Sequence, residues 1–218
     1  MKPRQNRWLT RRGFGVHSPW AYDIIVNVIN EKRPYYAYGD ICSSLEEAPK
    51  HLPQYPQSRN ELLFRLVNRF NPDLILEIGT GAGVSAGYLA SVSNRSRVVT
   101  VDETHPDVPE VKKYLELFPN ISYITGNIAD IAGEILEGDN TPGFVHIAHT
   151  SLWRQTAERI IEFATPKMVV VIEDIKEKEK REWWRDIIKD ERVGVTFSMN
   201  KLGILFFDLK MIKQNYIL

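Results

Sequence analysis

Hydrophobic and polar residues follow two periodicities along this chain. Short, almost wholly apolar runs recur from residue 74 onward, and stretches with apolar residues three or four positions apart separate them. The first pattern is typical of buried β-strands and the second of amphipathic helices. The predicted strands cover 74–79, 97–102, 121–126, 144–148 and 168–174, and the predicted helices cover 84–92, 108–118, 130–136, 152–163 and 177–189. Five strand–helix units in succession favour an α/β fold with a doubly wound parallel sheet.

The last part of the chain breaks this alternation. Residues 193–199 and 203–209 form two strand-like runs that a short turn joins. Because no helix lies between them, we expect an antiparallel hairpin at one edge of the sheet. The sheet would then have seven strands.

Residues 1–57 are less regular. Ser18 and Pro19 have the form of a helix N-cap and first helical residue, and an apolar stripe follows them. Residues 33–57 contain four prolines and four tyrosines, which predicts a long irregular connection, either a lid or a packed loop. Ser58 and Glu61 have the spacing of a capping box before the next helix. We therefore divide the chain into an N-terminal helix and lid segment, 1–57, and a main domain, 58–218.

The composition excludes several classes of protein. The chain has 218 residues, 43% of them hydrophobic, a net charge of +0 and one cysteine, Cys42. This composition argues against disorder, and a single cysteine permits no disulfide within the chain, which favours the cytoplasm. No apolar run reaches the roughly 18–20 residues of a membrane span. Residues 1–20 carry five basic residues and no acid, which fits a transit peptide, a phosphate-binding arm or a solvated terminus.

Three glycines follow the first predicted strand. Such a loop in an open α/β sheet lies where ligands bind, because glycines let the backbone approach them. The run from Gly81 to Ala86 fits a loose dinucleotide fingerprint, but it begins two residues after the strand ends at Gly79. The run E-x-G-x-G-x-G from Glu77 to Gly83 resembles the cofactor loop of class I S-adenosylmethionine (SAM)-dependent methyltransferases. Together with the terminal hairpin, it favours a Rossmann-like methyltransferase fold.

The resemblance covers about 58–218 and is closest to small-molecule O-methyltransferases of the catechol and caffeoyl-CoA type. It implies SAM as the cofactor, with contacts from Glu77, Gly79, Thr80, Gly81, Gly83, Ser85, Asp102, Glu103, Asn127, Ile128, Ala148 and His149.

Several of these residues have expected roles. The Ser85 hydroxyl would hold the amino-acid carboxylate of SAM. Asp102 would accept hydrogen bonds from the ribose hydroxyls, with Glu103 as the alternative acid. Asn127 stands where many relatives have an aspartate that accepts from the adenine amino group, and its amide oxygen could still accept. Ile128 would pack against the adenine ring.

The acids that bind a divalent metal in the metal-dependent relatives are largely missing. Those relatives place an aspartate at the end of the fourth strand, where this chain has Ala148, and an Asp-Asn pair at the end of the fifth. Here the fifth strand ends with Glu173 and Asp174, which would point to opposite faces of an extended strand. We therefore expect no catalytic divalent metal.

Histidines offer other chemistry. The run GFGVHSP around His17 resembles the opening of methyltransferase-like proteins. His17 could act as the general base, with the segment folding over the cofactor and Tyr35, Tyr36 and Tyr38 forming an aromatic lid; alternatively, it braces the N-terminal helix. His146 and His149 are three apart and would face opposite sides of a strand, which makes them a poor metal pair. We expect His146 to pack beneath a helix and His149 to contact adenine.

Three functions remain open. The first is a SAM-dependent methyltransferase that acts on a small molecule by metal-independent O-methylation, with an aromatic acceptor as one option. The second is a SAM-binding protein with reduced or lost catalysis. The third is an RNA methyltransferase, which the basic N-terminus suggests. The chain lacks both the Asn/Asp-Pro-Pro-aromatic run of amino methyltransferases and a recognisable RNA-binding domain, which argues against a nucleic-acid partner. We expect no membrane partner, and a homodimer stays open.

Overall fold

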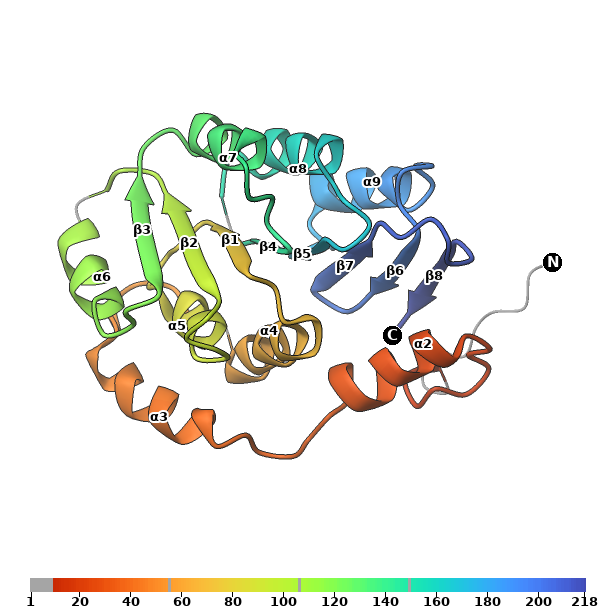
Figure 1. Ribbon diagram of the computed structural model, residues 1–218, viewed down its shortest axis with the longest axis horizontal. Helices are drawn as coiled ribbons and strands as arrows, with labels where there is room; N and C mark the ends of the chain where they lie inside the picture. Colours follow the sequence, from red (N-terminus) through yellow and green to blue (C-terminus); the bar gives the residue numbers. More distant parts are fainter. Residues whose placement is uncertain (1–9, 55, 106, 149) are drawn as a thin grey trace.

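The computed structural model describes residues 10–54, 56–105, 107–148 and 150–218. In these residues an eight-stranded sheet has the order β3-β2-β1-β4-β5-β7-β6-β8. The strands are β1 (Leu74–Ile78), β2 (Arg97–Asp102), β3 (Ile121–Thr125), β4 (Phe144–Ile147), β5 (Val169–Glu173), β6 (Val195–Ser198), β7 (Leu202–Phe206) and β8 (Gln214–Ile217). Helices cover both faces of the sheet, as Figure 1 shows. The predicted α/β architecture is confirmed.

The first five strands are parallel, and β1 lies between β2 and β4. The chain adds strands on one side of β1 and then returns to its other side, which creates a switch point between β1 and β4. Loops that leave the carboxyl ends of these two strands diverge to opposite faces of the sheet, and the crevice between them is where ligands bind in such folds.

The C-terminal hairpin is confirmed, because β7 pairs antiparallel with both β5 and β6. The predicted number of seven strands was one too low. β8 adds to the outer side of β6 in a parallel arrangement, in register from Gln214 opposite Val195 to Ile217 opposite Ser198. This strand has four residues, and its sequence QNYI shows too little apolar pattern to be recognised without its partner.

The helices form two layers. α4 (Gln57–Phe70), α5 (Val84–Ala90) and α6 (Val108–Leu115) lie on one side, and α7 (Ile128–Glu137), α8 (Trp153–Glu162) and α9 (Lys178–Ile187) lie on the other (Figure 1). Alternate residues of β1 enter the two apolar cores: Leu76 and Ile78 face α7–α9, whereas Ile75 faces α4. This two-residue alternation is what the pleat of a strand covered on both faces requires.

The N-terminal segment packs against the main domain. α2 (Pro19–Asp23) continues as a π-helical turn over Ile24–Ile29, and Trp20 meets the ring of Phe206 edge-on at 4.9 Å. The predicted irregular stretch 33–57 contains a helix, α3 (Ala37–Ser44), and a short 3-10 turn (Leu45–Glu47), so that prediction was wrong in part.

The predicted aromatic lid and capping box both differ from the structure. Tyr35 and Tyr38 pack against Phe64 of α4 with ring centroids 5.2 and 5.1 Å away, whereas Tyr36 is fully exposed. These rings anchor α3 to α4. The predicted capping box is absent, because α4 begins at Gln57 and its N-cap residue makes no side-chain hydrogen bond.

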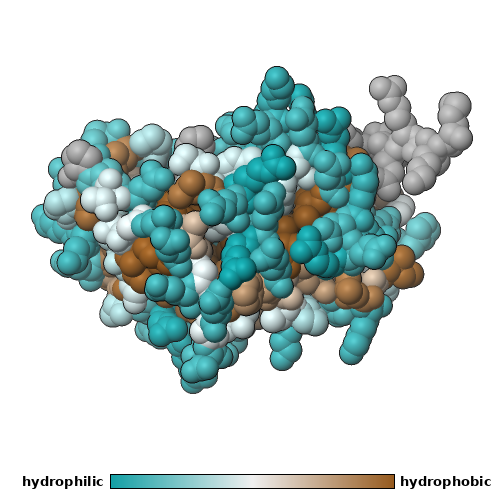
Figure 2. Space-filling model, turned by 90° about the horizontal axis from the view of Figure 1, so that it is seen from above, coloured by the Kyte–Doolittle hydropathy of each residue, from teal (hydrophilic) through white to brown (hydrophobic). Residues whose placement is uncertain are grey.

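The surface is mixed in character. On the face that Figure 2 shows, hydrophilic residues predominate, and hydrophobic residues appear between them in several places. None of the helices in the described ranges is long and apolar enough to cross a membrane.

Candidate functional site

The loop after β1 depends on glycine. Gly79, Gly81 and Gly83 have φ angles of 88°, 52° and 79°, a left-handed region that other residues rarely adopt. A side chain at Gly83 would also meet Leu115 Cδ2 at 2.9 Å, so this glycine lets the loop pack closely on α6. A Cβ at Gly81 would meet no atom within 4 Å. The loop is therefore packed at its end and open at its middle.

Asp102, at the end of β2, holds this loop in place. Its Oδ2 accepts a hydrogen bond of 2.9 Å from the Gly81 N–H, and its Oδ1 accepts one of 2.9 Å from the Glu103 N–H. Burial raises the pKa of the Asp102 carboxyl, and these two N–H groups partly offset the rise. The carboxylate therefore lies directly beside the open middle of the glycine loop.

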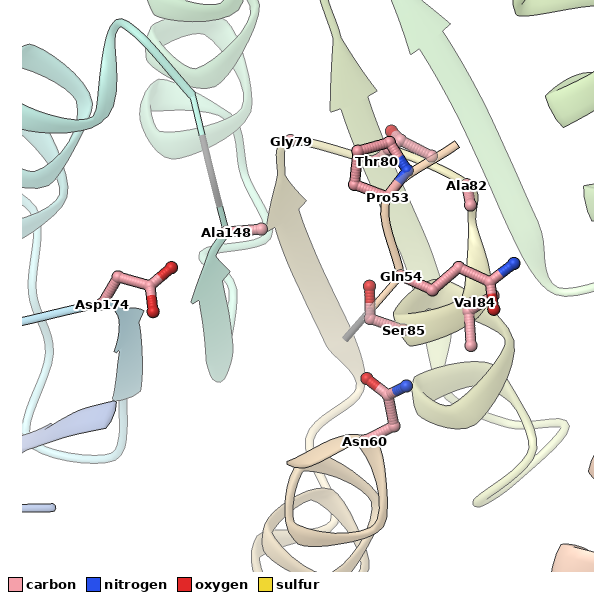
Figure 3. Close-up of a pocket in the computed structure, with 11 residues that line it drawn as sticks. Pro53, Gln54, Asn60, Gly79, Thr80, Ala82, Val84, Ser85, Ala148 and Asp174 are labelled. Atoms are coloured by element: carbon pink, nitrogen blue, oxygen red, sulfur yellow. The ribbon is translucent and has the colours of Figure 1, made fainter. Parts of the chain in front are cut away.

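A cavity of about 230 Å³ lies at the carboxyl ends of β1, β4 and β5, at the switch point (Figure 3). The described residues that line it are Pro53, Gln54, Asn60, Gly79, Thr80, Gly81, Ala82, Val84, Ser85, Ala148 and Asp174. The glycine loop and α5 form one wall, the start of α4 another, and Ala148 and Asp174 a third. Pro53 and Gln54 come from the segment before α4.

The wall that contains Pro53 and Gln54 is tied to the rest of the protein. Gln54 Nε2 donates to the carbonyl oxygen of Pro49 at 3.4 Å. His51 Nε2 lies 3.1 Å from Asp107 Oδ1, just before α6. The first contact lies within the segment, and the second joins the segment to the residues just before α6.

The structure gathers most of the predicted cofactor contacts around this cavity. Five of them line it directly: Gly79, Thr80, Gly81, Ser85 and Ala148. Gly83 packs against α6 at the end of the loop. Asp102 does not line the cavity itself, but it accepts a hydrogen bond from the N–H of Gly81, which does. Glu103 lies at the end of the same strand, where its Oε1 accepts from the Ser151 hydroxyl at 3.2 Å.

Two predicted adenine contacts have other partners in the structure. Asn127 is the N-cap of α7, and its Oδ1 accepts from the Ala129 N–H at 3.0 Å and from the Asp130 N–H at 3.3 Å. The oxygen that we expected to accept from adenine is thus engaged by the backbone. Ile128 is fully buried in the core beneath α7, so its side chain lines no part of the cavity. His149 lies outside the described residues.

The structure does not bring His17 to the cavity. His17 is exposed and directly precedes Ser18, whose Oγ accepts from the Ala21 N–H at 3.2 Å and caps α2. Trp20 of that helix packs against Phe197 of β6 and Phe206 of β7, whereas the cavity lies at β1, β4 and β5. His17 therefore lies beside the N-terminal helix and not at the cavity.

His146 is the centre of a buried ionic network that sequence reasoning missed. Its Nδ1 lies 3.0 Å from Glu77 Oε1 and its Nε2 lies 3.2 Å from Glu173 Oε1, and all three side chains are fully buried. His146 is buried, as predicted, in a network that includes Arg59 of α4, but its two carboxylate partners were not foreseen. One of them, Glu77, was a predicted cofactor contact, and it is fully buried in this network instead. Burial by itself would lower the pKa of His146, but the two glutamates raise it to about 9. The imidazole is thus a cation that donates to both carboxylates.

The network continues to both sides of the cavity. Thr100 Oγ1 donates to Glu77 Oε2 at 2.7 Å, so its proton is used and Thr80 must donate to Thr100 across their 2.7 Å contact. At the other end, Glu173 pairs with Arg59, whose second nitrogen lies 3.8 Å from Asp174 Oδ1. Because Thr80 and Asp174 both line the cavity, the network connects two of the cavity walls.

Glu173 and Asp174 have different surroundings, as their adjacent positions predicted. Glu173 points into the buried network, and Asp174 leaves the strand with φ 55° and faces the cavity. In the described part of the chain, no three His, Cys, Asp or Glu side chains are arranged to hold a metal ion.

Comparisons with known proteins agree on the fold. No protein-family model matches the sequence, and no curated protein matches it. Solved structures do. An O-methyltransferase from Bacillus cereus in complex with S-adenosylhomocysteine (SAH) is 18% identical, with a TM-score of 0.63 over 83% of this chain and 96% of that one.

Two further structures are similar to the same extent. The O-methyltransferase TomG from Streptomyces achromogenes, involved in tomaymycin synthesis and solved with SAM, has 16% identity and a TM-score of 0.61 over 80% of this chain and 91% of its own. The SAH-bound methyltransferase PaMTH1 from Podospora anserina has 10% identity and a TM-score of 0.63 over 87% and 96%. With its sheet order, its terminal hairpin and its glycine loop at the switch point, this chain has the fold of the class I SAM-dependent O-methyltransferases.

Proposed function

We propose that this protein is a SAM-dependent methyltransferase that acts on a small molecule, by O-methylation and without a catalytic metal. The observation that carries this proposal is the glycine loop held on Asp102 beside a cavity at the switch point. A carboxylate at this place can accept from two neighbouring hydroxyls, as ribose offers.

The residues present fit such a cofactor. The open side of Gly81 leaves room that a Cβ would fill, next to a carboxylate that can take more hydrogen bonds than the two it has. Ser85 and Thr80 lie on the same wall, and the Thr80 hydroxyl already donates to Thr100. We propose that Gly79, Thr80, Gly81 and Ser85 hold the cofactor together with Asp102. SAM, when bound, would supply a methyl group on a sulfonium sulfur, so that an acceptor oxygen could form a bond to the methyl carbon as the carbon–sulfur bond breaks and SAH leaves as the thioether.

The chain's own contribution to such a reaction would be positioning and exclusion of water. Ala82, Val84, Ala148 and Pro53 give the cavity apolar walls. Apolar walls strengthen the electrostatic interactions of the groups that remain, and a fixed orientation lowers the entropic part of the barrier.

Thermal unfolding with SAM and with SAH tests this proposal. A ligand that binds only the folded protein at about 100 times its Kd stabilises it by about 2.7 kcal/mol, which raises the Tm measurably. We expect both compounds to raise the Tm, and ATP and NAD at the same concentration to leave it unchanged. An unchanged Tm at saturating SAM and SAH would overturn the proposal.

One observation favours a second function, a SAM-binding protein with reduced or lost catalysis. Ala148 stands at the end of β4, where the metal-dependent relatives carry an acid, and it lines the cavity. Incubation with radiolabelled SAM and a panel of phenols, alcohols and amines separates the two functions. Tight SAM binding without methyl transfer to any acceptor would favour the binding protein.

A further inference from the structure

The side chain of Asn60 is buried in the cavity wall without a hydrogen-bond partner. It is 1% exposed, and its Oδ1 has no partner in the structure. Figure 3 shows its amide below Ser85, directed into the cavity. Buried polar atoms are almost always hydrogen-bonded, because desolvation without a partner costs free energy. Because this unpaired amide oxygen belongs to a residue that lines the cavity, a group bound there can supply its partner.

A carboxylate faces the same cavity from the end of β5. The Asp174 side chain is 18% exposed and lines the cavity, and its φ of 55° is unusual for a residue other than glycine. Such conformations collect at ligand sites, and aspartate tolerates them better than most residues. Of the described residues that line the cavity, Asp174 is the only one with an ionisable acid or base in its side chain.

Ion pairs lie directly behind Asp174. They join three carboxylates, Glu77, Glu173 and Asp174, to His146 and Arg59. Glu77 and Glu173 are fully buried, so Asp174 is the carboxylate of these three that lines the cavity.

Lys180 lies behind the same strand. Its Nζ donates to the backbone carbonyl oxygen of Glu173 at 3.1 Å and makes no ion pair within 4.0 Å among the described residues. Burial lowers the pKa of its amine, and the charges of Glu177, Asp174 and Glu173 oppose that shift. Lys180 thus contributes positive charge near Asp174 without forming an ion pair with its carboxylate among the described residues.

We propose that Asn60 and Asp174 bind a protonated amine in the cavity. An ammonium group can donate one N–H to the amide oxygen and another to the carboxylate, which an anion cannot do. The amine has two chemical sources: the α-amino group of the cofactor, in which case the inference rests on the proposed function, or an amine on the methyl acceptor.

Calorimetry on the full-length protein distinguishes these sources. The variants are Asn60→Ala and Asp174→Asn, and the ligands are SAH and 5′-methylthioadenosine, which keeps the adenosine and thioether but lacks the amino acid. If the cofactor supplies the amine, both variants weaken SAH binding about tenfold and leave 5′-methylthioadenosine binding within about twofold. Asp139→Asn, an equal charge change at an exposed residue away from the cavity, is the matched control and should change neither.

The second arm titrates benzylammonium into the SAH-saturated protein. If the acceptor supplies the amine, SAH binding is unchanged in both variants, and benzylammonium binds to the wild type but not to Asn60→Ala or Asp174→Asn. Equal binding of all three compounds by wild type and variants would overturn the inference. If the wild type binds neither SAH nor 5′-methylthioadenosine, the proposed function fails separately, and benzylammonium titrated into the free protein then decides the subsite by the same comparison.

Discussion

At the scale of single residues, Asp102 combines two tasks that sequence motifs usually separate. It is the acid that the motif assigns to the ribose, and its two oxygens also hold the glycine loop through the Gly81 and Glu103 N–H groups. A change at Asp102 would therefore alter the shape of the loop that forms the cavity together with the proposed ribose contact.

We predict that Asp102→Asn weakens SAH binding at least about tenfold and lowers the free energy of unfolding by about 1–2 kcal/mol. The amide cannot accept from both N–H groups, because one of its two polar atoms is a donor. Isothermal titration calorimetry and urea unfolding measure the two effects.

Glu103→Gln is the matched control, because that carboxylate accepts only from Ser151 within the described part of the chain. It should leave SAH binding within about twofold. A larger loss for Glu103→Gln than for Asp102→Asn would assign the ribose to Glu103 instead.

At the scale of elements, α9 lies so close to β7 that the strand has room for no side chain at one position. A Cβ at Gly203 would meet the Trp184 ring at 2.4 Å. Trp184 also donates from Nε1 to Ser198 Oγ of β6 at 2.8 Å, so the ring has a fixed place over the hairpin.

We predict that Gly203→Ala lowers the free energy of unfolding by about 1–3 kcal/mol, because the methyl group forces the ring or the helix away. Gly133→Ala is the opposite case: it lies in α7, where a Cβ meets nothing within 4 Å. It should stabilise the protein by about 0.5–1 kcal/mol, since alanine is the better helix former. Thermal unfolding of both variants checks the two signs, and a stable Gly203→Ala protein would contradict the packing.

At the scale of the whole molecule, the His146 network joins three strands and the first helix of the main domain. It connects β1, β4, β5 and α4 through charges that the sheet and the helices remove from water. Such a network makes stability depend on pH, because the charged imidazole exists in the folded protein at pH values where the unfolded chain has lost the proton.

The sign follows from the raised pKa of His146. With a folded pKa of about 9 and an ordinary value of 6.5, its contribution is fully present below pH 6.5 and is lost as the pH rises through about 9. We predict a loss on the order of 3 kcal/mol between pH 6 and 9.5, below the range in which tyrosines ionise. Urea unfolding across that range measures it.

Nuclear magnetic resonance of histidine labelled with ¹⁵N gives an independent reading. The ring of His146 should carry protons on both nitrogens at pH 8. A neutral ring at pH 7 would contradict the ionic network, whatever the urea series shows.

The features that could be predicted from the sequence are those that depend on residues close together in the chain. We could predict β1 to β5 and the helices that follow them from the pattern of apolar residues. Burial favours apolar runs in strands and apolar stripes with a period of about three and a half residues in helices. The glycine loop could be predicted for a different local reason, because the left-handed backbone at Gly79, Gly81 and Gly83 favours glycine. The ribose role expected of Asp102 came from the resemblance to the methyltransferase family.

Contacts between residues far apart in the chain could not be predicted from the sequence. His146 lies 69 positions from Glu77 and 27 from Glu173, and its role depends on the register of β4 against β1 and β5. Asn60 lies between Ser58 and Glu61, which predicted a capping box, and its place in the cavity wall follows from where α4 begins. β8 forms by pairing with the outer edge of β6. These features share one physical reason: they arise from pairing and packing between segments far apart in the chain, which local periodicity does not contain.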